Sequence, residues 1–265
     1  SSTVAPLLAS SMMGWSAFGH PFGWRGMYLI VLMLSLLPVI PALYGKFPDS
    51  TETAEERLPL KVFFRDRIAW MIVLILSCGV VAELSIGSWL VNYLEKAQEW
   101  PTEQASGMLS LFFLFFMLAR LLLGPLTDKI GYLMSIIILS AVASLCCIGA
   151  ILGNGQTAIL FAVAGAGVAP IYPTVMALIA KRYPNGTESA ITFTVTLMGI
   201  GSVLGNLFIG AVIDIASQFA TAQGWENSIK FGMQAGFMVI ALLSLLCSLF
   251  AAVLYSVLRK NQELL

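Results

Sequence analysis

Apolar segments long enough to cross a lipid bilayer dominate this sequence. A spanning helix needs about 20 apolar residues, and eight segments meet this length if the first is counted as partial. They cover residues 4–19, 27–44, 68–93, 105–124, 133–153, 157–180, 189–214 and 231–258. Their apolar residues are continuous rather than alternating, which argues against a transmembrane β-barrel. The sequence therefore predicts an all-α, polytopic membrane protein.

The composition agrees with this class and excludes several functions. Only 11% of the residues are charged, against roughly 25% in soluble domains. The net charge is zero and the chain has a single histidine, so we expect neither a nucleic-acid partner nor a metal site. No phosphate-binding glycine loop, catalytic triad or pair of carboxylates is present, so we expect no cofactor and no enzyme. The four cysteines lie within apolar segments and are interpreted as small packing residues: Cys78, Cys146, Cys147 and Cys247.

Lysine and arginine predict the orientation of the chain, because they are enriched on the cytoplasmic side of membrane proteins. The richer side contains the polar segment 45–67, the loops 125–132 and 181–188, and the C-terminus. Its basic residues are Lys46, Arg57, Lys61, Arg65, Arg67, Arg120, Lys129, Lys181, Arg182, Arg259 and Lys260. The other side has only Arg25, Lys96 and Lys230. We therefore expect a multi-pass protein of the cell membrane with a cytoplasmic C-terminus.

A short pattern occurs twice in the last six predicted spans. Gly124 and Asp128 close one span at its cytoplasmic end, and Gly210 and Asp214 close another at its outer end with the same spacing. An inverted repeat of three plus three spans would produce this arrangement. Two residue types are few, so coincidence explains the pattern equally well.

The segment Ala119–Tyr132, ARLLLGPLTDKIGY, resembles the signature loop of the major facilitator superfamily, Gly-x-Leu-x-Asp-Arg-x-Gly-Arg. The matching residues are Gly124, Leu126, Asp128 and Gly131, whereas Lys129 and Tyr132 replace residues that are usually arginine. We expect Gly124 to allow a close helix approach, Pro125 to end the helix, and Asp128 to receive Arg120 or a neighbouring helix N-terminus. The alternative is a tight, charged cytoplasmic turn without a family-specific role.

Two further segments resemble one branch of that superfamily, the fucose permease-like fucose/galactose/glucose–proton symporters. Ala82–Tyr93, AELSIGSWLVNY, is similar to its seventh span, and Gly165–Thr174, GAGVAPIYPT, to its tenth. The resemblance implies a bundle of twelve helices of which about eight are present here. Residues 1–44 would be the last two helices of the N-terminal half, 45–67 the cytoplasmic linker, and 68–265 the C-terminal six-helix half. The best-known proton-linked carboxylates of the family belong to the N-terminal half, which is largely missing from this sequence.

Glu83 is the strongest candidate for a functional residue. It lies near the middle of its predicted span, where a carboxylate costs about 2.5 kcal/mol or more on insertion scales. Burial disfavours its charged form, so it could carry a proton. It could equally accept a hydrogen bond from a sugar hydroxyl. The alternative is a structural hydrogen bond to a neighbouring helix.

The next candidates come from a proline-containing span. Pro170 and Pro173 lie in mid-span and each lacks a backbone donor, so each leaves a carbonyl without its helical partner. Within a membrane this is tolerated where protein or a cavity satisfies the carbonyl. We expect this span to line a cavity, with Tyr172 and Thr174 as polar contacts. A kink that serves helix packing alone is the alternative.

The following span is unusually polar. Ser202 and Asn206 share a helical face, and we expect Asn206 to contact the solute. Gly201 and Gly205 form a Gly-x-x-x-Gly pair, which favours close helix packing.

Three more residues are candidate outer gates: Asn92, Tyr93 and Asp214. Asn92 and Tyr93 lie near the outer end of the span that contains Glu83, but on another face of a regular helix. Tyr93 is equally well explained as an anchor at the membrane interface.

Together these features predict a secondary active transporter that moves a small polar solute, with a sugar as the expected class, together with protons by alternating access. Its expected partners are the solute, protons, the lipid bilayer and the missing N-terminal half of the same protein. An exporter of drugs or lipid-linked molecules is the alternative within transport. A receptor or scaffold that keeps the fold without transporting is the alternative outside it.

Overall fold

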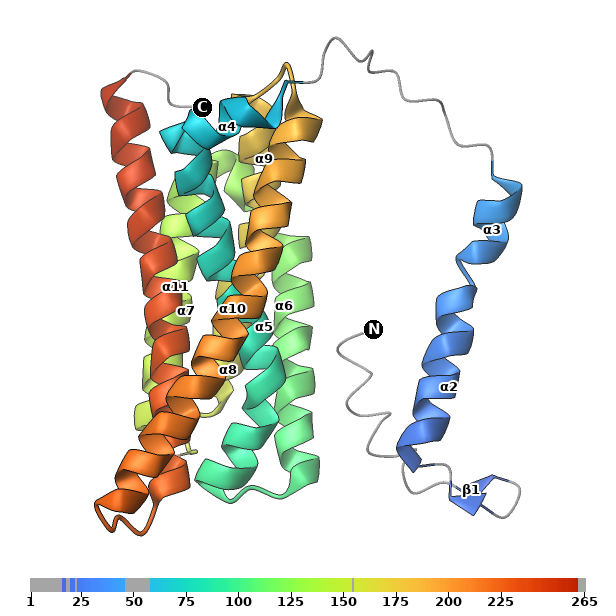
Figure 1. Cartoon of the computed structure of the whole chain (residues 1–265), viewed down its shortest axis with the longest axis vertical. Coiled ribbons are helices and arrows are strands. Elements are labelled where there is room, and N and C mark those ends of the chain that lie inside the picture. The colour runs from blue at the N-terminus through green and yellow to red at the C-terminus, as the bar shows by residue number, and fades with distance from the viewer. Residues whose placement is uncertain (1–15, 18–19, 22, 46–57, 154, 262–265) are drawn as a thin grey trace.

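Six membrane-spanning segments form one bundle in the computed structural model (Figure 1). The structure describes residues 16–17, 20–21, 23–45, 58–153 and 155–261. The bundle helices are α5 (Arg67–Gln98), α6 (Thr102–Ile130), α7 (Tyr132–Leu152), α8 (Ile159–Val168) with α9 (Ile171–Arg182) as one broken span, α10 (Thr187–Ala222) and α11 (Ser228–Lys260). The predicted all-α membrane architecture is confirmed, and the spans fall close to their predicted positions.

The N-terminal elements lie apart from this bundle in Figure 1. Two short strands, β1 (Ser16–Ala17) and β2 (His20–Pro21), pair antiparallel, and α2 (Gly23–Leu36) and α3 (Val39–Tyr44) follow. These two helices occupy the predicted span 27–44, but a turn at residues 37–38 separates them, because Pro38 cannot continue the helix. Most of the predicted span 4–19 lies outside the described residues, as does most of the segment 45–67.

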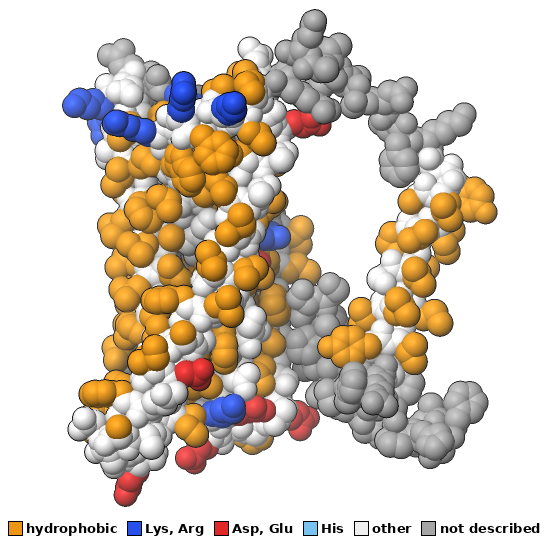
Figure 2. All heavy atoms as spheres, viewed as in Figure 1, with side chains coloured by type: hydrophobic (Ala, Val, Ile, Leu, Met, Phe, Trp, Pro, Cys, Tyr) orange, Lys and Arg blue, Asp and Glu red, His pale blue; other side chains and the backbone are white. Residues whose placement is uncertain are grey.

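Most charged side chains gather at the two ends of the bundle, and the surface between the ends is mainly apolar (Figure 2). Lys and Arg side chains lie at the end that carries the C-terminus, and Asp and Glu side chains dominate the opposite end. The exposed basic residues of the first end are Lys61, Arg65, Arg67, Lys129, Lys181, Arg259 and Lys260. An apolar band between polar ends matches the cross-section of a bilayer.

α6 ends later than the sequence predicts. Pro125 was expected to end the helix but lies inside it, and α6 continues to Ile130. A proline inside a helix removes one hydrogen bond, the one to the carbonyl four residues earlier, and α6 continues without it. The chain reverses instead at Gly131, whose φ of +96° is accessible to glycine without strain.

The contact between α5 and α10 depends on glycine. A Cβ atom on Gly205 would lie 2.5 Å from Val81 Cγ1, and one on Gly201 would lie 3.2 Å from Ser77 Oγ. The predicted packing role of the Gly-x-x-x-Gly pair is thus confirmed. The contact brings the polar residues of α10 against the helix that carries Glu83.

A short helix, α4 (Leu60–Arg65), covers the basic end of the bundle. Its Phe63 is fully buried, 5.3 Å from the Tyr183 ring and 5.8 Å from the Phe193 ring between centroids. Asp66 begins α5 by accepting a hydrogen bond from the Ile68 amide, and its second oxygen accepts one from the Tyr183 hydroxyl at 2.5 Å. The residues that precede α5 are thereby fixed to the loop between α9 and α10.

We predict that Gly205→Ala lowers the melting temperature of the protein, whereas Gly199→Ala on the same helix does not. Alanine favours a helix by about 0.5–1 kcal/mol over glycine, but at position 205 it meets the stiff, buried Val81 side chain, and overpacking costs about 1–3 kcal/mol. Gly199 has no neighbouring atom within 4 Å among the described residues. Equal effects of the two variants on thermal unfolding would contradict this packing.

Tyr183→Phe should destabilise the protein by about 1–2 kcal/mol, because Asp66 loses a hydrogen bond to its carboxylate. Burial, followed by the Asp66 hydrogen bond and charge, raises the pKa of Tyr183 above its ordinary value of 10. The stabilisation is therefore complete below pH 10 and is lost as the pH rises through the higher folded value. Unfolding of wild type and variant from pH 6 to 9 should show a constant difference. Tyr255→Phe on α11 is the control, and an equal loss there would argue against the specific bond.

Candidate functional site

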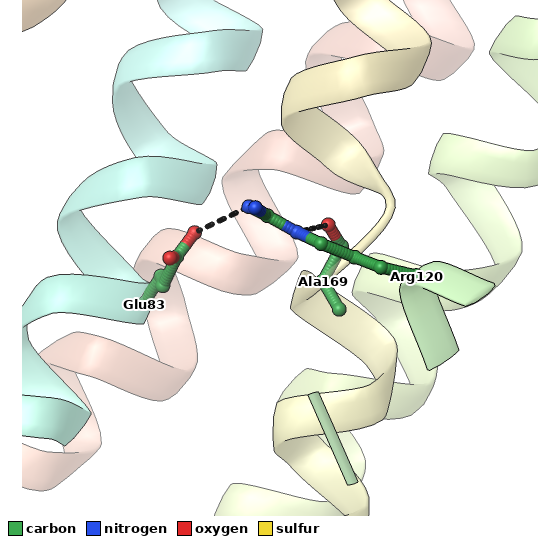
Figure 3. Close-up of polar contacts among 3 residues, drawn as sticks. All are labelled: Glu83, Arg120 and Ala169. Atoms are coloured by element: carbon green, nitrogen blue, oxygen red, sulfur yellow. Dashed lines mark hydrogen bonds and ion pairs between the residues drawn. The ribbon is translucent and has the colours of Figure 1, made fainter. Parts of the chain in front are cut away.

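The site is organised around the interruption between α8 and α9. Helical hydrogen bonding would require the amide of residue 173 to donate to the carbonyl of Ala169, but Pro173 has no amide hydrogen. The Nε of Arg120, on α6, donates to this carbonyl at 3.0 Å instead. Figure 3 shows the Arg120 side chain reaching from its own helix to the broken one. A side chain of another helix therefore satisfies the backbone group that the proline leaves unpaired.

The same guanidinium also faces Glu83 on α5. Arg120 Nη2 lies 3.8 Å from Glu83 Oε2 (Figure 3). The guanidinium carbon lies 4.3 Å from the centre of the Phe116 ring. The end of α8 adds a favourable partial negative charge beside the cation. Arg120 is thus held by a backbone carbonyl, an aromatic face and a carboxylate that come from three different spans.

This pair lies far from the helix ends and remains accessible. Glu83 is near the middle of α5, and its side chain is 19% exposed, while that of Arg120 is 41% exposed. Charged residues this deep in a membrane protein normally face the interior or a water-filled cavity. The exposed side of α5 and α6 is consequently the surface on which a polar path can form.

A cavity of about 910 Å³ opens between α5 and α10. Its polar lining consists of Ser88, Asn92, Ser202, Asn206 and Asp214, with Trp89 and several aliphatic residues completing the wall. Ser85 donates to Asn206 Oδ1 at 3.2 Å, and Asn206 Nδ2 donates to the Ser202 carbonyl at 3.4 Å. The structure therefore brings Asn206, Asn92 and Asp214 into one cavity. Glu83 is not part of its lining, but the next residue, Leu84, is.

Comparison with known proteins identifies the family. The family model of the Major Facilitator Superfamily matches residues 1–206 and 100–264, which together cover nearly the whole chain. The chain belongs to the Major Facilitator Superfamily. A search of curated proteins gave no significant match.

The fold is also similar to a solved superfamily transporter, FucP, whose crystal structure is in the outward conformation. The TM-score is 0.63 at 17% sequence identity, and the similarity covers 87% of this chain and 54% of FucP. The chain thus spans about half the length of that transporter. At this identity the comparison establishes the fold alone.

The superfamily signature loop differs from its expected geometry in two places. Arg120 was expected near Asp128, but eight residues of helix, about 12 Å, separate them, and Arg120 bonds to Ala169 instead. Arg120 therefore does not belong to the basic residues of the helix end. Gly124 was expected to allow a close helix approach, yet a Cβ there would meet no atom within 4 Å among the described residues. Gly124 is half-buried, and Asp128 is exposed.

Three other candidates do not line this cavity. Tyr93 is fully buried, with its ring centre 4.4 Å from that of Phe237, and its hydroxyl accepts a hydrogen bond from Gln98. It is a core residue, so the interpretation as an interfacial anchor is wrong. Tyr172 packs half-buried against the core, and Thr174 is buried. Both occupy the first turns of α9, next to the helix break.

The partnership between Arg120 and Ala169 was missed, although the sequence contains a signal for it. Pro173 lies four residues after Ala169, which marks that carbonyl as unpaired. Arg120 lies in an apolar segment where a cation needs a partner. The sequence cannot show that the Arg120 side chain pairs with the Ala169 carbonyl, because the two groups lie on different helices.

We predict that cysteines introduced at Ser88 and Asn92 react with a membrane-impermeant maleimide, whereas a cysteine at Ala82 does not. Both former positions line the cavity, while Ala82 on the same helix is fully buried. Because thiol reactivity requires access, the labelling rates should differ about tenfold or more. The unmodified protein, whose own cysteines lie buried or half-buried, gives the background. Comparable labelling at all three positions would contradict the assigned cavity face.

Proposed function

We propose that this chain is part of a secondary active transporter that moves a small polar solute, with a sugar as the expected class, together with protons by alternating access. The observation that carries the proposal is the Glu83–Arg120 pair, which lies at mid-span beside a broken helix on an exposed side of the bundle. Superfamily membership supports membrane transport as the general activity.

Each charged side chain near the centre of a bilayer costs about 2.5–3.5 kcal/mol on insertion scales. A partly exposed ion pair facing lipid would be unfavourable, whereas the same pair facing an aqueous cavity would not. We therefore assign the exposed side of α5, α6 and α10 to the interface with the other half of the transporter, where substrate sites of such folds lie.

Glu83 supplies the element that responds to protons. Binding of a proton removes its charge and with it the attraction for Arg120 across 3.8 Å. Protons can drive transport only if Glu83 binds them with different affinity in the inward- and outward-open states. A carboxylate that pairs with a cation on another helix has this property when the two helices move relative to each other.

The domain organisation follows from this proposal. Residues 1–44 end the N-terminal half, 45–67 link the halves, and 68–265 form the C-terminal half. The basic end of the bundle in Figure 2 favours a cytoplasmic C-terminus in the cell membrane. The site is then completed by the N-terminal half, so transport is a property of the full-length protein.

The test is uptake of radiolabelled hexoses by the full-length protein in proteoliposomes, with and without an inward proton gradient. We expect gradient-dependent accumulation in wild type. Glu83→Gln should abolish accumulation but keep exchange across the membrane, because glutamine retains the shape and hydrogen bonding without taking up a proton. Glu95→Gln, on the same helix near the acidic end, is the matched control.

Unchanged accumulation by Glu83→Gln would remove Glu83 from proton coupling. Absence of uptake across the hexose panel would exclude the sugar assignment. Efflux of apolar compounds in its place would favour the exporter.

A further inference from the structure

Arg120 has hydrogen-bonding capacity that the described residues do not use. A guanidinium has five N–H donors. Nε donates to Ala169, whereas Nη2 lies 3.8 Å from Glu83, which is too long for a hydrogen bond. Within the described part of the chain, no acceptor bonds the four Nη hydrogens. The guanidinium is therefore fixed at Nε, whereas its two Nη groups, called the fork below, are open to an acceptor.

We propose that the fork of Arg120 binds the carboxylate of a hydroxylated organic acid, of the sugar-acid type, and that this displaces Glu83, which then takes up the transported proton. This inference rests on the proposed function and narrows its solute to an anion. The planar guanidinium matches a carboxylate in a bidentate arrangement, which is stronger and more directional than a contact to a neutral hydroxyl.

Glu83 is a weak competitor for this fork. It approaches one nitrogen with one oxygen, because its position on α5 fixes the direction of approach. An incoming carboxylate is free to use both oxygens and gains the shorter, charge-assisted bonds. The bond of Nε to Ala169 remains intact during the exchange, since it uses a different edge of the guanidinium.

Charges balance in this exchange. The empty site contains one positive charge on Arg120 and one negative charge on Glu83. The loaded site contains Arg120, the solute carboxylate and a protonated Glu83, so one anion and one proton have entered together. The only new covalent bond is the O–H bond of Glu83, formed when the carboxylate loses its counter-charge in a partly buried position. Both states are neutral, which keeps the charge at mid-membrane constant during the conformational change.

No other described group next to Glu83 offers a competing charge. α6 contributes Arg120, and the α8–α9 break contributes the Ala169 carbonyl, with Tyr172 in the first turn of α9 as the titratable residue. α10 contributes the uncharged Asn206, and its Asp214 lies eight residues further along the helix, about 12 Å away along its axis. α11 packs against α5 through Cys247, and its charged residues are at its ends: Lys230, Arg259 and Lys260.

The hydroxyl groups of such a solute have partners nearby. Leu84 follows Glu83 and lines the cavity between α5 and α10, which offers the amide of Asn206 and the hydroxyl of Ser202. Its volume of about 910 Å³ lies within the usual range for small-molecule sites. A charged group for the carboxylate and uncharged polar groups for hydroxyls are the two components that a sugar acid requires.

The experiment uses the full-length protein in proteoliposomes with radiolabelled D-glucuronate and other hexuronates and hexonates, each paired with its neutral hexose. We expect the acids to accumulate under an inward proton gradient and the neutral hexoses to compete poorly. Initial rates should not respond to a potassium diffusion potential set with valinomycin, because one anion moves with one proton. A neutral sugar carried with a proton would respond, since net charge would cross the membrane.

Variants test the role of Arg120 itself. Arg120→Gln should raise the KM for the acid about tenfold or more, because it removes the charge-assisted pair. Arg120→Lys keeps the charge without the fork and should show an intermediate KM. Arg259→Gln, at the end of α11, is the matched control and should behave as wild type. Gel-filtration profiles and melting temperatures of all variants distinguish lost binding from lost folding.

The outcomes separate this inference from the function on which it rests. Gradient-driven uptake of neutral hexoses without uptake of, or competition by, the acids would overturn the anion site and leave proton-coupled sugar transport intact. Absence of any gradient-driven uptake would overturn the proposed function and this inference together. Acid uptake with an unchanged KM in Arg120→Gln would also overturn the assigned site.

Discussion

The hydrogen bond from Arg120 to the Ala169 carbonyl connects the main features of this bundle. Pro173 leaves that carbonyl without a helical donor, and an unpaired backbone group costs several kcal/mol in a membrane. Arg120 satisfies the carbonyl and places its own charge at mid-span, where the charge in turn needs a counter-ion. Glu83 supplies it from α5. The break in α8–α9, the arginine at mid-span and the carboxylate are thus mutually dependent.

Two neighbouring groups of polar residues lie on the exposed side of the bundle. One contains the ion pair between α5 and α6, and the other lines the cavity between α5 and α10. α5 carries residues of both groups, and the glycine contact with α10 keeps Asn206 within reach of Ser85. A movement of α5 relative to its neighbours would therefore alter both groups at once. We propose that this shared helix couples the proton to the solute.

Much of the fold could be predicted from local sequence because each span is long and continuously apolar. The packing role of Gly205 is also predictable from the sequence, since small residues at this spacing pack against another helix. The site was less predictable. The sequence indicates Glu83 because it is a single carboxylate in the middle of an apolar span. Its partner Arg120 cannot be predicted in the same way, because that contact depends on which helices become neighbours. The interpretation of Tyr93 as an interfacial anchor is wrong for the same reason. Its ring packs against Phe161 and Phe237 of other helices, which places it in the core.

An experimental structure of the full-length protein in a lipid nanodisc, determined with a bound solute, tests the central claim most directly. We predict that Glu83 and Arg120 border a water-accessible cavity between the two halves and that the solute contacts this pair. A structure in which lipid or tightly packed protein covers the pair, with the solute bound elsewhere, would contradict the assignment of this surface as the transport path.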